Sequence, residues 1–339
     1  MIIDLRSDTV TKPGKGMLDA MMNADVGDDV FAEDPTVLKL EKKACELFGM
    51  EAGLFCPSGT MTNQVAIKVH TQPGDELLCD KHSHIYNYEG GGIAFNSGVQ
   101  SKILDGDRGR INTKQVLENI NPVQDWLTRT SLVCIENTVN RAGGSMYELN
   151  EMKELSKVCK DNKLKFHLDG ARIFNALVEH NYSAKDVGGL MDSVSICLSK
   201  GLGAPAGSVL LGKSEFIKNA RRVRKVFGGG MRQAGFIAAA GVYALDNNVK
   251  RLTDDHKRAK EIGNVLSLQS YVRSVEPVET NIIIFALDEK ISGDAFVKKL
   301  ANENIKAVPF GGQNVRFVTH LDFTDEMLTR TIEVLKKIS

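Results

Sequence analysis

The chain has 339 residues with 43 basic and 43 acidic side chains, so its formal net charge is zero. This length suits one large α/β domain with a smaller partner, or two domains. A neutral chain with interspersed charges gives no electrostatic support for binding nucleic acid or a membrane surface, and we expect neither partner. The longest apolar runs, such as residues 281–287, are far too short to cross a bilayer.

The cysteines and the first residues bear on the compartment. Six cysteines occur without any Cys-x-x-Cys pair, and most of them lie in apolar strand-like runs, which favours a reducing compartment. The first residues are charged where a secretory signal would be apolar, so we expect a soluble cytoplasmic protein. The histidines form no common zinc spacing. His82 and His84 could share one face of a strand, but we expect no metal site.

Predicted strands and helices alternate over the first two thirds of the chain. Apolar runs predict the strands, and a 3.6-residue periodicity predicts the helices between them. The alternation predicts an α/β fold with a mostly parallel seven-stranded sheet and helices on both faces. A short glycine-rich connection between the last two strands favours a local antiparallel pair. The expected strands are 54–56, 76–79, 100–104, 131–136, 165–168, 194–198 and 208–211, and the expected helices include 39–48, 60–69 and 149–161.

The character of the sequence changes after residue 230. One long helical stretch is expected over 233–268, followed by short strands at 271–275, 281–287, 306–309 and 314–318 with helices at 293–303 and 324–337. We therefore expect a large α/β domain over 1–245 and a small α+β domain over 246–339. The long helix would bridge the two, and the interface between them is a common place for a ligand site.

Lys200 and Asp169 are the first candidate site residues. Lys200 ends the apolar run 193–199 and precedes a glycine-rich stretch. Desolvation at the end of a buried strand would lower its pKa and expose the nucleophilic amine that a Schiff base needs. The alternative is a lysine whose head group reaches water. Asp169 ends another strand-like run, so both groups fall at the carboxyl edge of the sheet. The alternative for Asp169 is an N-cap of the next helix.

These two groups are what pyridoxal 5'-phosphate (PLP) requires of a protein: a lysine for its aldehyde and a carboxylate for its pyridinium nitrogen. A phosphate cradle is the third requirement. The strand, turn and helix over 53–69 would present free backbone N–H groups to an anion, with Gly59 and Thr60 at the turn. Arg232 offers a further cation. Arg316, in a strand of the second domain, could bind a substrate carboxylate, although an ordinary surface arginine is the alternative.

Seven segments carry a family resemblance: residues 4–11, 27–30, 33–36, 57–61, 167–172, 198–201 and 228–233. They include the runs DLRSDTVT, HLDGAR and GGGMRQ. Taken together, they make the chain resemble the threonine aldolases. These belong to the β-eliminating lyase group of PLP-dependent enzymes, which have the aspartate aminotransferase-like fold, or fold type I.

The resemblance implies a role for each matched residue. Lys200 would form the Schiff base, Asp169 would pair with the pyridinium nitrogen, and His84 would stack on the pyridine ring. Arg232 would come from a neighbouring subunit of a homotetramer. The implied cofactor-binding residues are Gly59, Thr60, His84, Asp169, Arg172, Lys200 and Arg232, and the implied substrate-binding residues are Ser7, Phe31, Trp126, Arg172 and Arg316.

Three positions depart from the family pattern. Val139 and Trp126 stand where the family usually has histidine, and Phe31 stands where it often has tyrosine. Trp126 and Phe31 would lie near the β-substituent of the substrate. Fewer polar partners for a β-hydroxyl favour a larger or more apolar side chain, or leave the hydroxyl to His84 and water.

The implied activity is that of an aldehyde-lyase. It would cleave L-threonine, L-allo-threonine or a related β-hydroxy-α-amino acid to glycine and an aldehyde. The expected catalytic residues are Lys200, His84 and Asp169. His84 would take the β-hydroxyl proton directly or through water, or serve only as a stacking ring. The alternatives are a β-eliminating lyase, an aldolase for a bulkier substrate, and a non-catalytic binding module. The intact set of Lys200, Asp169 and Arg172 argues against the non-catalytic module.

Overall fold

The computed structural model describes residues 1–180 and 182–338. Its largest element is a seven-stranded sheet in the order β2-β8-β7-β6-β5-β3-β4. The strands β3 to β7 are parallel, whereas β8 is antiparallel to both of its neighbours. The expected antiparallel pair after the lysine strand is therefore confirmed. The strands are β2 (Ala52–Cys56), β3 (Asp75–Asp80), β4 (Gln100–Leu104), β5 (Arg129–Glu136), β6 (Lys165–Gly170), β7 (Ser193–Cys197) and β8 (Ser208–Gly212).

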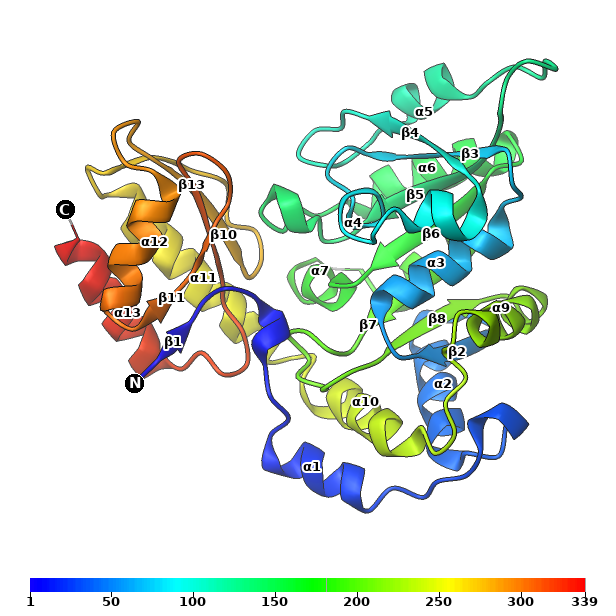
Figure 1. Ribbon diagram of the computed structural model, residues 1–339, viewed down its shortest axis with the longest axis horizontal. Helices are drawn as coiled ribbons and strands as arrows, with labels where there is room; N and C mark the ends of the chain where they lie inside the picture. The colour runs from blue at the N-terminus through cyan, green and yellow to red at the C-terminus, as the bar shows by residue number, and fades with distance from the viewer. Residues whose placement is uncertain (181, 339) are drawn as a thin grey trace.

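Helices cover both faces of this sheet, as predicted (Figure 1). Successive side chains of a strand point to opposite faces. In β2, Phe55 belongs to the core cluster that contains residues of α2 (Pro35–Phe48) and α6 (Leu149–Asp161), whereas Leu54 and Cys56 belong to a cluster with residues of α3 (Gly59–His70) and α9 (Ser214–Val226). The other helices of this part are α1 (Lys15–Met22), α4 (His84–Asn87), α5 (Thr113–Asn119), α7 (Ile173–Glu179), α8 (Ala184–Gly188) and α10 (Gly235–Asn247).

The start and end of α2 show how local sequence sets an element. Asp34 is the N-cap, and its side chain accepts hydrogen bonds from the amides of Thr36 and Val37. Pro35 occupies the first turn, where its missing N–H costs nothing. Gly49 ends the helix with a φ of 63°, a left-handed conformation that suits glycine.

The C-terminal part forms a second layer with its own core. Four antiparallel strands lie in the order β12-β13-β10-β9, and β1 pairs in parallel with β11. Figure 1 shows the N-terminal strand lying with this part of the molecule. Ile3 and Leu5 accordingly belong to the C-terminal core. The predicted division at residue 245 stays a prediction. The elements are β1 (Ile3–Asp4), α11 (Leu252–Ser267), β9 (Val272–Val275), β10 (Ile282–Leu287), α12 (Gly293–Asn302), β11 (Ile305–Lys306), β12 (Val308–Pro309), β13 (Asn314–Val318) and α13 (Asp325–Lys337).

The prediction of one long helix over 233–268 is wrong. The structure has two helices, α10 and α11, separated by residues 248–251. Asn248 donates a side-chain hydrogen bond to the carbonyl oxygen of Leu202 at 2.8 Å, and Arg251 donates to that of Gly201 at 3.3 Å. These polar side chains bind backbone groups outside the helix, which competes with continued helical bonding. The break therefore braces the glycine-rich turn that follows Lys200.

Two further observations concern the whole of the described chain. The six cysteines are free thiols, and five of them are buried. Within residues 1–180 and 182–338, no helix combines the length and the apolar character needed to cross a membrane.

Candidate active site

A pocket of about 550 Å³ lies between the carboxyl edge of the large sheet and the C-terminal part of the chain. Its walls include Val308, Phe310 and Arg316 from the C-terminal part, and Lys200 and His84 from segments that follow strands β7 and β3. The structure thus brings together five predicted site residues in one cavity: Ser7, His84, Arg172, Lys200 and Arg316. Carboxyl edges of parallel strands are the usual ligand sites of such sheets.

Lys200 lies three residues beyond the end of β7, in a turn that is held from two sides. Thr11 donates a hydrogen bond to the Lys200 carbonyl oxygen at 2.9 Å, and the contacts from Asn248 and Arg251 brace the next residues. The Nζ atom lies 3.8 Å from Sγ of Cys197. The backbone of the lysine is therefore fixed, while its amine faces the pocket.

Asp169 lies near the end of β6, almost fully buried. Its Oδ2 accepts a hydrogen bond from the Asn63 side chain at 2.8 Å, and its Oδ1 accepts from the amide of Ala171 at 3.1 Å. Behind it, His167 lies beside Ser193 and Asn63. Burial lowers the pKa of His167 to about 4, so this ring is neutral at physiological pH. The carboxylate of Asp169 thus has fixed donors on its inner side.

Glu136 is a second buried carboxyl group at the same sheet edge. It ends β5 directly opposite Asp169 in the sheet register. Burial and the neighbouring charge of Asp169 raise the pKa of Glu136 to about 7, because two adjacent carboxylates resist ionising together. Its oxygens accept from the amides of His84 at 2.7 Å and Asn140 at 2.9 Å. Glu136 therefore fixes two pocket loops relative to each other.

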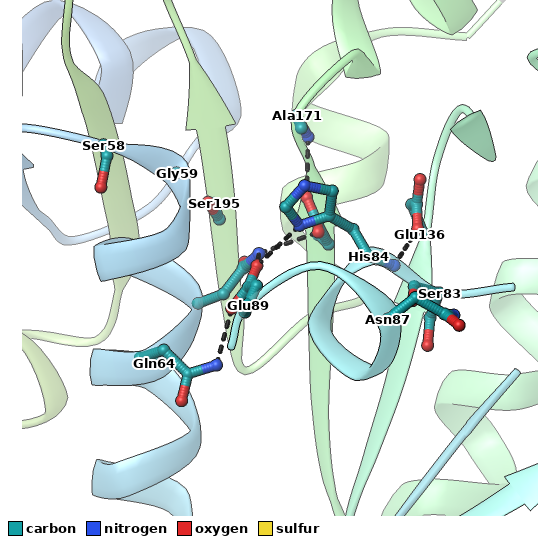
Figure 2. A network of polar contacts seen from close by, with 12 residues as sticks. Ser58, Gly59, Gln64, Ser83, His84, Asn87, Glu89, Glu136, Ala171 and Ser195 are labelled. Atoms are coloured by element: carbon teal, nitrogen blue, oxygen red, sulfur yellow. Dashed lines mark hydrogen bonds and ion pairs between the residues drawn. The ribbon is translucent and has the colours of Figure 1, made fainter. Parts of the chain in front are cut away.

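His84 begins helix α4 and lines the pocket. Figure 2 shows its ring beside Glu89. Its Nδ1 lies 2.9 Å from Oε1 of Glu89. Burial alone would lower the pKa of His84. The hydrogen bond to Glu89 and the negative charges of Asp169, Glu89 and Glu136 outweigh burial and raise it. Tyr88 lies beside the ring, with the two ring centres 5.6 Å apart.

Arg172 and Arg316 supply two guanidinium groups to the pocket. Arg172 is buried and donates through Nε and Nη2 to both oxygens of Asp8, at 2.8 and 2.7 Å. Among the described residues its Nη1 has no hydrogen-bond partner, so this group can bind a carboxylate. Arg316, on β13, donates to the Asn140 side chain and to the Arg6 carbonyl oxygen, each at 3.1 Å. Both guanidiniums are therefore oriented before any ligand arrives.

The predicted phosphate cradle is the start of helix α3. Ser58 caps the helix by accepting from the amide of Met61 at 3.2 Å. Within the described residues, the amides of Gly59 and Thr60 have no acceptor, as expected for a helix N-terminus. A Cβ on Gly59 would lie 2.4 Å from Sγ of Cys197, so only glycine fits there. Cys197 contacts Lys200 on one side and Gly59 on the other, which places the cradle beside the lysine.

This set of groups fits PLP. An amine, a buried carboxylate, an imidazole ring and a helix N-terminus with free amides converge from α3, α4, β6 and the turn after β7. Each group matches one part of the cofactor: aldehyde, pyridine nitrogen, ring face and phosphate. The fit follows from the positions of these side chains and backbone amides in the structure.

Three predicted site residues lie elsewhere in the single chain. Arg232 is exposed and pairs with Asp28 at 2.9 Å. Phe31 and Trp126 are 69% and 78% exposed. None of the three lines the pocket. Their assignment to the site therefore stays a prediction that depends on a neighbouring subunit.

A metal ion was not expected, and the local contacts bear on that expectation. Ligand atoms of His84, Glu89 and Asp169 lie within 4.8 Å of one another. Asn63, however, donates N–H bonds to both carboxylates, and an N–H donor between two carboxylates opposes a cation there. His82 and His84 do not share a strand, because His84 begins α4.

Four polar residues of the site were not assigned roles from the sequence: Asp8, Asn63, Glu89 and Glu136. Asp8 stands inside the matched segment 4–11, and Glu136 ends a predicted strand, so their positions were visible without their partners. Asn63 is a buried polar residue in a helix packed against the sheet. A polar residue in a helix that is expected to be buried is the signal that could have identified it.

Comparisons with known proteins identify relatives of this chain. The family model for beta-eliminating lyase matches residues 4–290. The low specificity L-threonine aldolase of Escherichia coli (strain K12) is 42% identical over 329 residues, covering 96% of each chain. The probable low-specificity L-threonine aldolase 2 of Arabidopsis thaliana is 40% identical over 343 residues, covering 99% of this chain and 97% of that one.

A solved structure supports the fold. The threonine aldolase of Leishmania major superposes with a TM-score of 0.86 at 22% sequence identity, covering 99% of both chains. At this identity the likeness establishes the fold alone. The family match and the identity to full-length relatives go further, and they show that this chain belongs to the beta-eliminating lyase family.

Proposed function

We propose that this chain is a PLP-dependent aldolase that cleaves L-threonine, L-allo-threonine or a related β-hydroxy-α-amino acid to glycine and an aldehyde. The observation that carries the proposal is the convergence of Lys200, His84, Arg172 and Arg316 on one pocket. The relatives named as threonine aldolases support the same reaction.

Each residue has a definite task in this reaction. Lys200 would hold the aldehyde of PLP, and Asp169 would hold its pyridine nitrogen in the protonated form. Gly59 and Thr60 would bind its phosphate through backbone amides. When bound, PLP supplies an electron sink for the bond that breaks at the α-carbon of the amino acid. Arg172 would contact the bound cofactor as well as the carboxylate of the substrate.

The substrate would be oriented by its carboxylate. Arg172 and Arg316 are fixed by Asp8 and Asn140 before binding, so little ordering is left for the substrate to induce. Ser7 also lines the pocket and could add a hydroxyl donor. Holding the carboxylate on one side decides which bond at the α-carbon can break, and such positioning contributes several kcal/mol to catalysis.

A proton must leave the β-hydroxyl as the carbon–carbon bond breaks. His84 is the imidazole that lines the pocket, and its ring is partly open to it. Trp126 cannot take this role, because indole has no basic nitrogen, and Val139 is buried and apolar. We therefore assign the proton transfer to His84, directly or through one water. A base in this position typically increases the rate by roughly 10²- to 10⁴-fold.

One observation favours a larger β-substituent as a second candidate. Phe310 lines the pocket with Arg141 and Arg316 over its ring, at 5.1 and 5.2 Å from the ring centre. Tyr88 also lines the pocket, and Arg141 lies over its ring at 5.7 Å from the ring centre. An aromatic wall of this kind can contact a side chain larger than a methyl group. An aldolase acting on aromatic β-hydroxy-amino acids is therefore the alternative.

The proposal includes an assembly and a compartment. We propose a homotetramer in which Arg232 of one subunit serves the pocket of another. Support comes from exposed large apolar side chains, among them Phe31, Phe95 and Trp126, since such groups commonly mark interfaces. Light scattering on the purified protein tests the assembly. Free cysteines support a reducing, cytoplasmic setting.

Product analysis tests the reaction. The protein is incubated with PLP and L-threonine, L-allo-threonine or an aromatic β-hydroxy-amino acid, and glycine, the aldehyde, ammonia and keto acid are measured. Glycine with acetaldehyde supports the aldolase. Ammonia with a keto acid would instead establish β-elimination. Glycine released only from aromatic β-hydroxy-amino acids would establish the second candidate, and bound PLP without any product would contradict both.

A further inference from the structure

The inference concerns Glu89 and rests on the proposed aldolase function. We propose that Glu89 is a positioning residue that holds His84 with a proton on Nδ1, so that Nε2 is the nitrogen that exchanges a proton with the substrate hydroxyl. In this step the β-hydroxyl O–H bond breaks and an Nε2–H bond forms. Cleavage leaves the bonding electron pair on the α-carbon, and the same proton can then return to that carbon.

The first support is the contact between the two side chains. Nδ1 of His84 lies 2.9 Å from Oε1 of Glu89 (Figure 2). A carboxylate offers only acceptors, so Nδ1 must carry the hydrogen in this contact. In the neutral ring, Nε2 is then the basic nitrogen. The hydrogen bond that one ring nitrogen makes thus decides which nitrogen is free for proton transfer.

The second support is that Glu89 is itself buried and hydrogen-bonded. Its side chain is fully buried. Asn63 donates to Oε1 at 2.9 Å and Gln64 donates to Oε2 at 2.6 Å. Both donors lie on helix α3, and Gly92 lets the loop approach this helix, since a Cβ there would lie 2.6 Å from the Gln64 side chain. Glu89 is therefore anchored to the helix that starts at the phosphate cradle.

The third support is the link from Glu89 to Asp169, the carboxylate proposed to bind the pyridine nitrogen. The amide nitrogen of Asn63 donates to Glu89 and also to Asp169 at 2.8 Å. The chain His84–Glu89–Asn63–Asp169 therefore holds the imidazole and the pyridine-binding carboxylate in one hydrogen-bonded unit. Glu89 faces the imidazolium and Asp169 would face the pyridinium, so each positive charge has its own carboxylate.

A second histidine–glutamate pair in the chain shows what a structural pair looks like. His256 has Nδ1 at 2.6 Å from Glu179 and Nε2 at 2.8 Å from Asn175. Its ring is almost fully buried, and both nitrogens are used. In His84, by contrast, the side chain is 31% exposed and Nε2 has no partner among residues 1–180 and 182–338. The free nitrogen toward the pocket is what separates an acid–base pair from a packing contact.

The charged groups around His84 define the expected titration. Glu89 contacts the ring from its own loop, Glu136 contacts the backbone amide from β5, and Asp169 approaches from β6. Tyr88 lies beside the His84 ring. The positively charged groups that line the same pocket are Lys200, Arg172 and Arg141. Removing the charge of Glu89 removes one stabiliser of the imidazolium. The pKa of His84 should then fall.

The test compares Glu89→Gln with the matched control Glu179→Gln. Nitrogen NMR of isotope-labelled histidine, with His84→Gln identifying the signal, reads the tautomer and titration of His84 with and without PLP. We expect the Nδ1–H tautomer in the unmodified chain. In Glu89→Gln we expect the His84 titration and the acid limb of kcat/KM to move together to lower pH. Glu179→Gln should leave both unchanged.

Two results would overturn the proposal. One is an Nε2–H tautomer for His84 in the unmodified chain, a measurement that needs no variant to fold. The other is a Glu89→Gln enzyme whose rate falls equally at every pH with an unmoved acid limb, since that describes a purely structural contact. Failure of the aldolase assignment is separate, because it appears as absent glycine while the His84 titration can still be read.

Discussion

The buried pair of Asp8 and Arg172 gives the sharpest stability prediction. Asp8 is fully buried and accepts two hydrogen bonds from Arg172. Burial alone would raise the pKa of Asp8, but the charges of Arg172 and Lys200 and the hydrogen bond from Asn281 outweigh it and lower the pKa to about 2. Each pKa unit corresponds to about 1.4 kcal/mol, so the ionised carboxylate stabilises the folded state by about 2 to 3 kcal/mol at neutral pH.

Asp8→Asn should lose at least this amount. The substitution also leaves the Arg172 charge buried without a counter-charge, which moves the expected loss toward about 3 to 5 kcal/mol. Because the folded-state pKa of Asp8 lies below its ordinary value of 3.8, its contribution is complete above that pH. It is lost as the pH falls toward 2. The deficit of the variant should therefore be largest at neutral pH and shrink in acid.

Urea unfolding followed by circular dichroism measures this deficit at neutral pH and at about pH 3, with PLP saturating in all samples. Asp19→Asn is the control, because Asp19 forms an exposed pair with Lys15 and should change stability little at either pH. An Asp8→Asn deficit of the same size at both pH values would refute the electrostatic reasoning. It would show that shape, not charge, sets the cost.

Three further substitutions test the cofactor and substrate groups. Lys200→Ala should abolish the absorbance band of bound PLP and the release of glycine while leaving the circular dichroism spectrum unchanged; retained turnover would exclude Lys200 as the essential amine. Arg316→Ala should raise KM on the order of 10- to 100-fold, the worth of a charged hydrogen bond, with the PLP spectrum nearly unchanged; an unaltered KM would place the carboxylate elsewhere. Gly59→Ala should weaken PLP binding and cost about 1 to 3 kcal/mol through its clash with Cys197. Adding Cys197→Ala should recover part of that stability, and no recovery would contradict the clash.

The sheet could be read from the sequence because its strands are buried on both faces. Runs such as 194–198 and 131–136 are mostly apolar, and the alternation of such runs with helical segments predicts parallel pairing. The lysine and the aspartate could be placed at the same edge for the same reason. The break at 248–251 could not be predicted, because it depends on the carbonyl oxygens of Gly201 and Leu202, which only the folded chain brings near.

The polar network around His84 could not be predicted from the sequence for a similar reason. Asn63, Glu89 and Asp169 are far apart along the chain and meet only when α3 packs on the sheet. Phe31 and Trp126 show the opposite limit. Family likeness assigns them to the site, yet in the single chain both are exposed away from the pocket. A site shared between subunits cannot be completed from one chain, whatever its sequence.

The pairing of β1 with β11 affects how the protein can be made. Ser7 and Asp8 follow a strand that finds its partner only at residues 305–306, near the other end of the chain. A ribosome must therefore synthesise almost the whole polypeptide before these residues can dock beside Arg172. The large sheet can form earlier, but the ion pair between Arg172 and Asp8 cannot. Substitutions that weaken the pairing of β1 with β11 should thus displace Asp8 from Arg172 while the large sheet still folds.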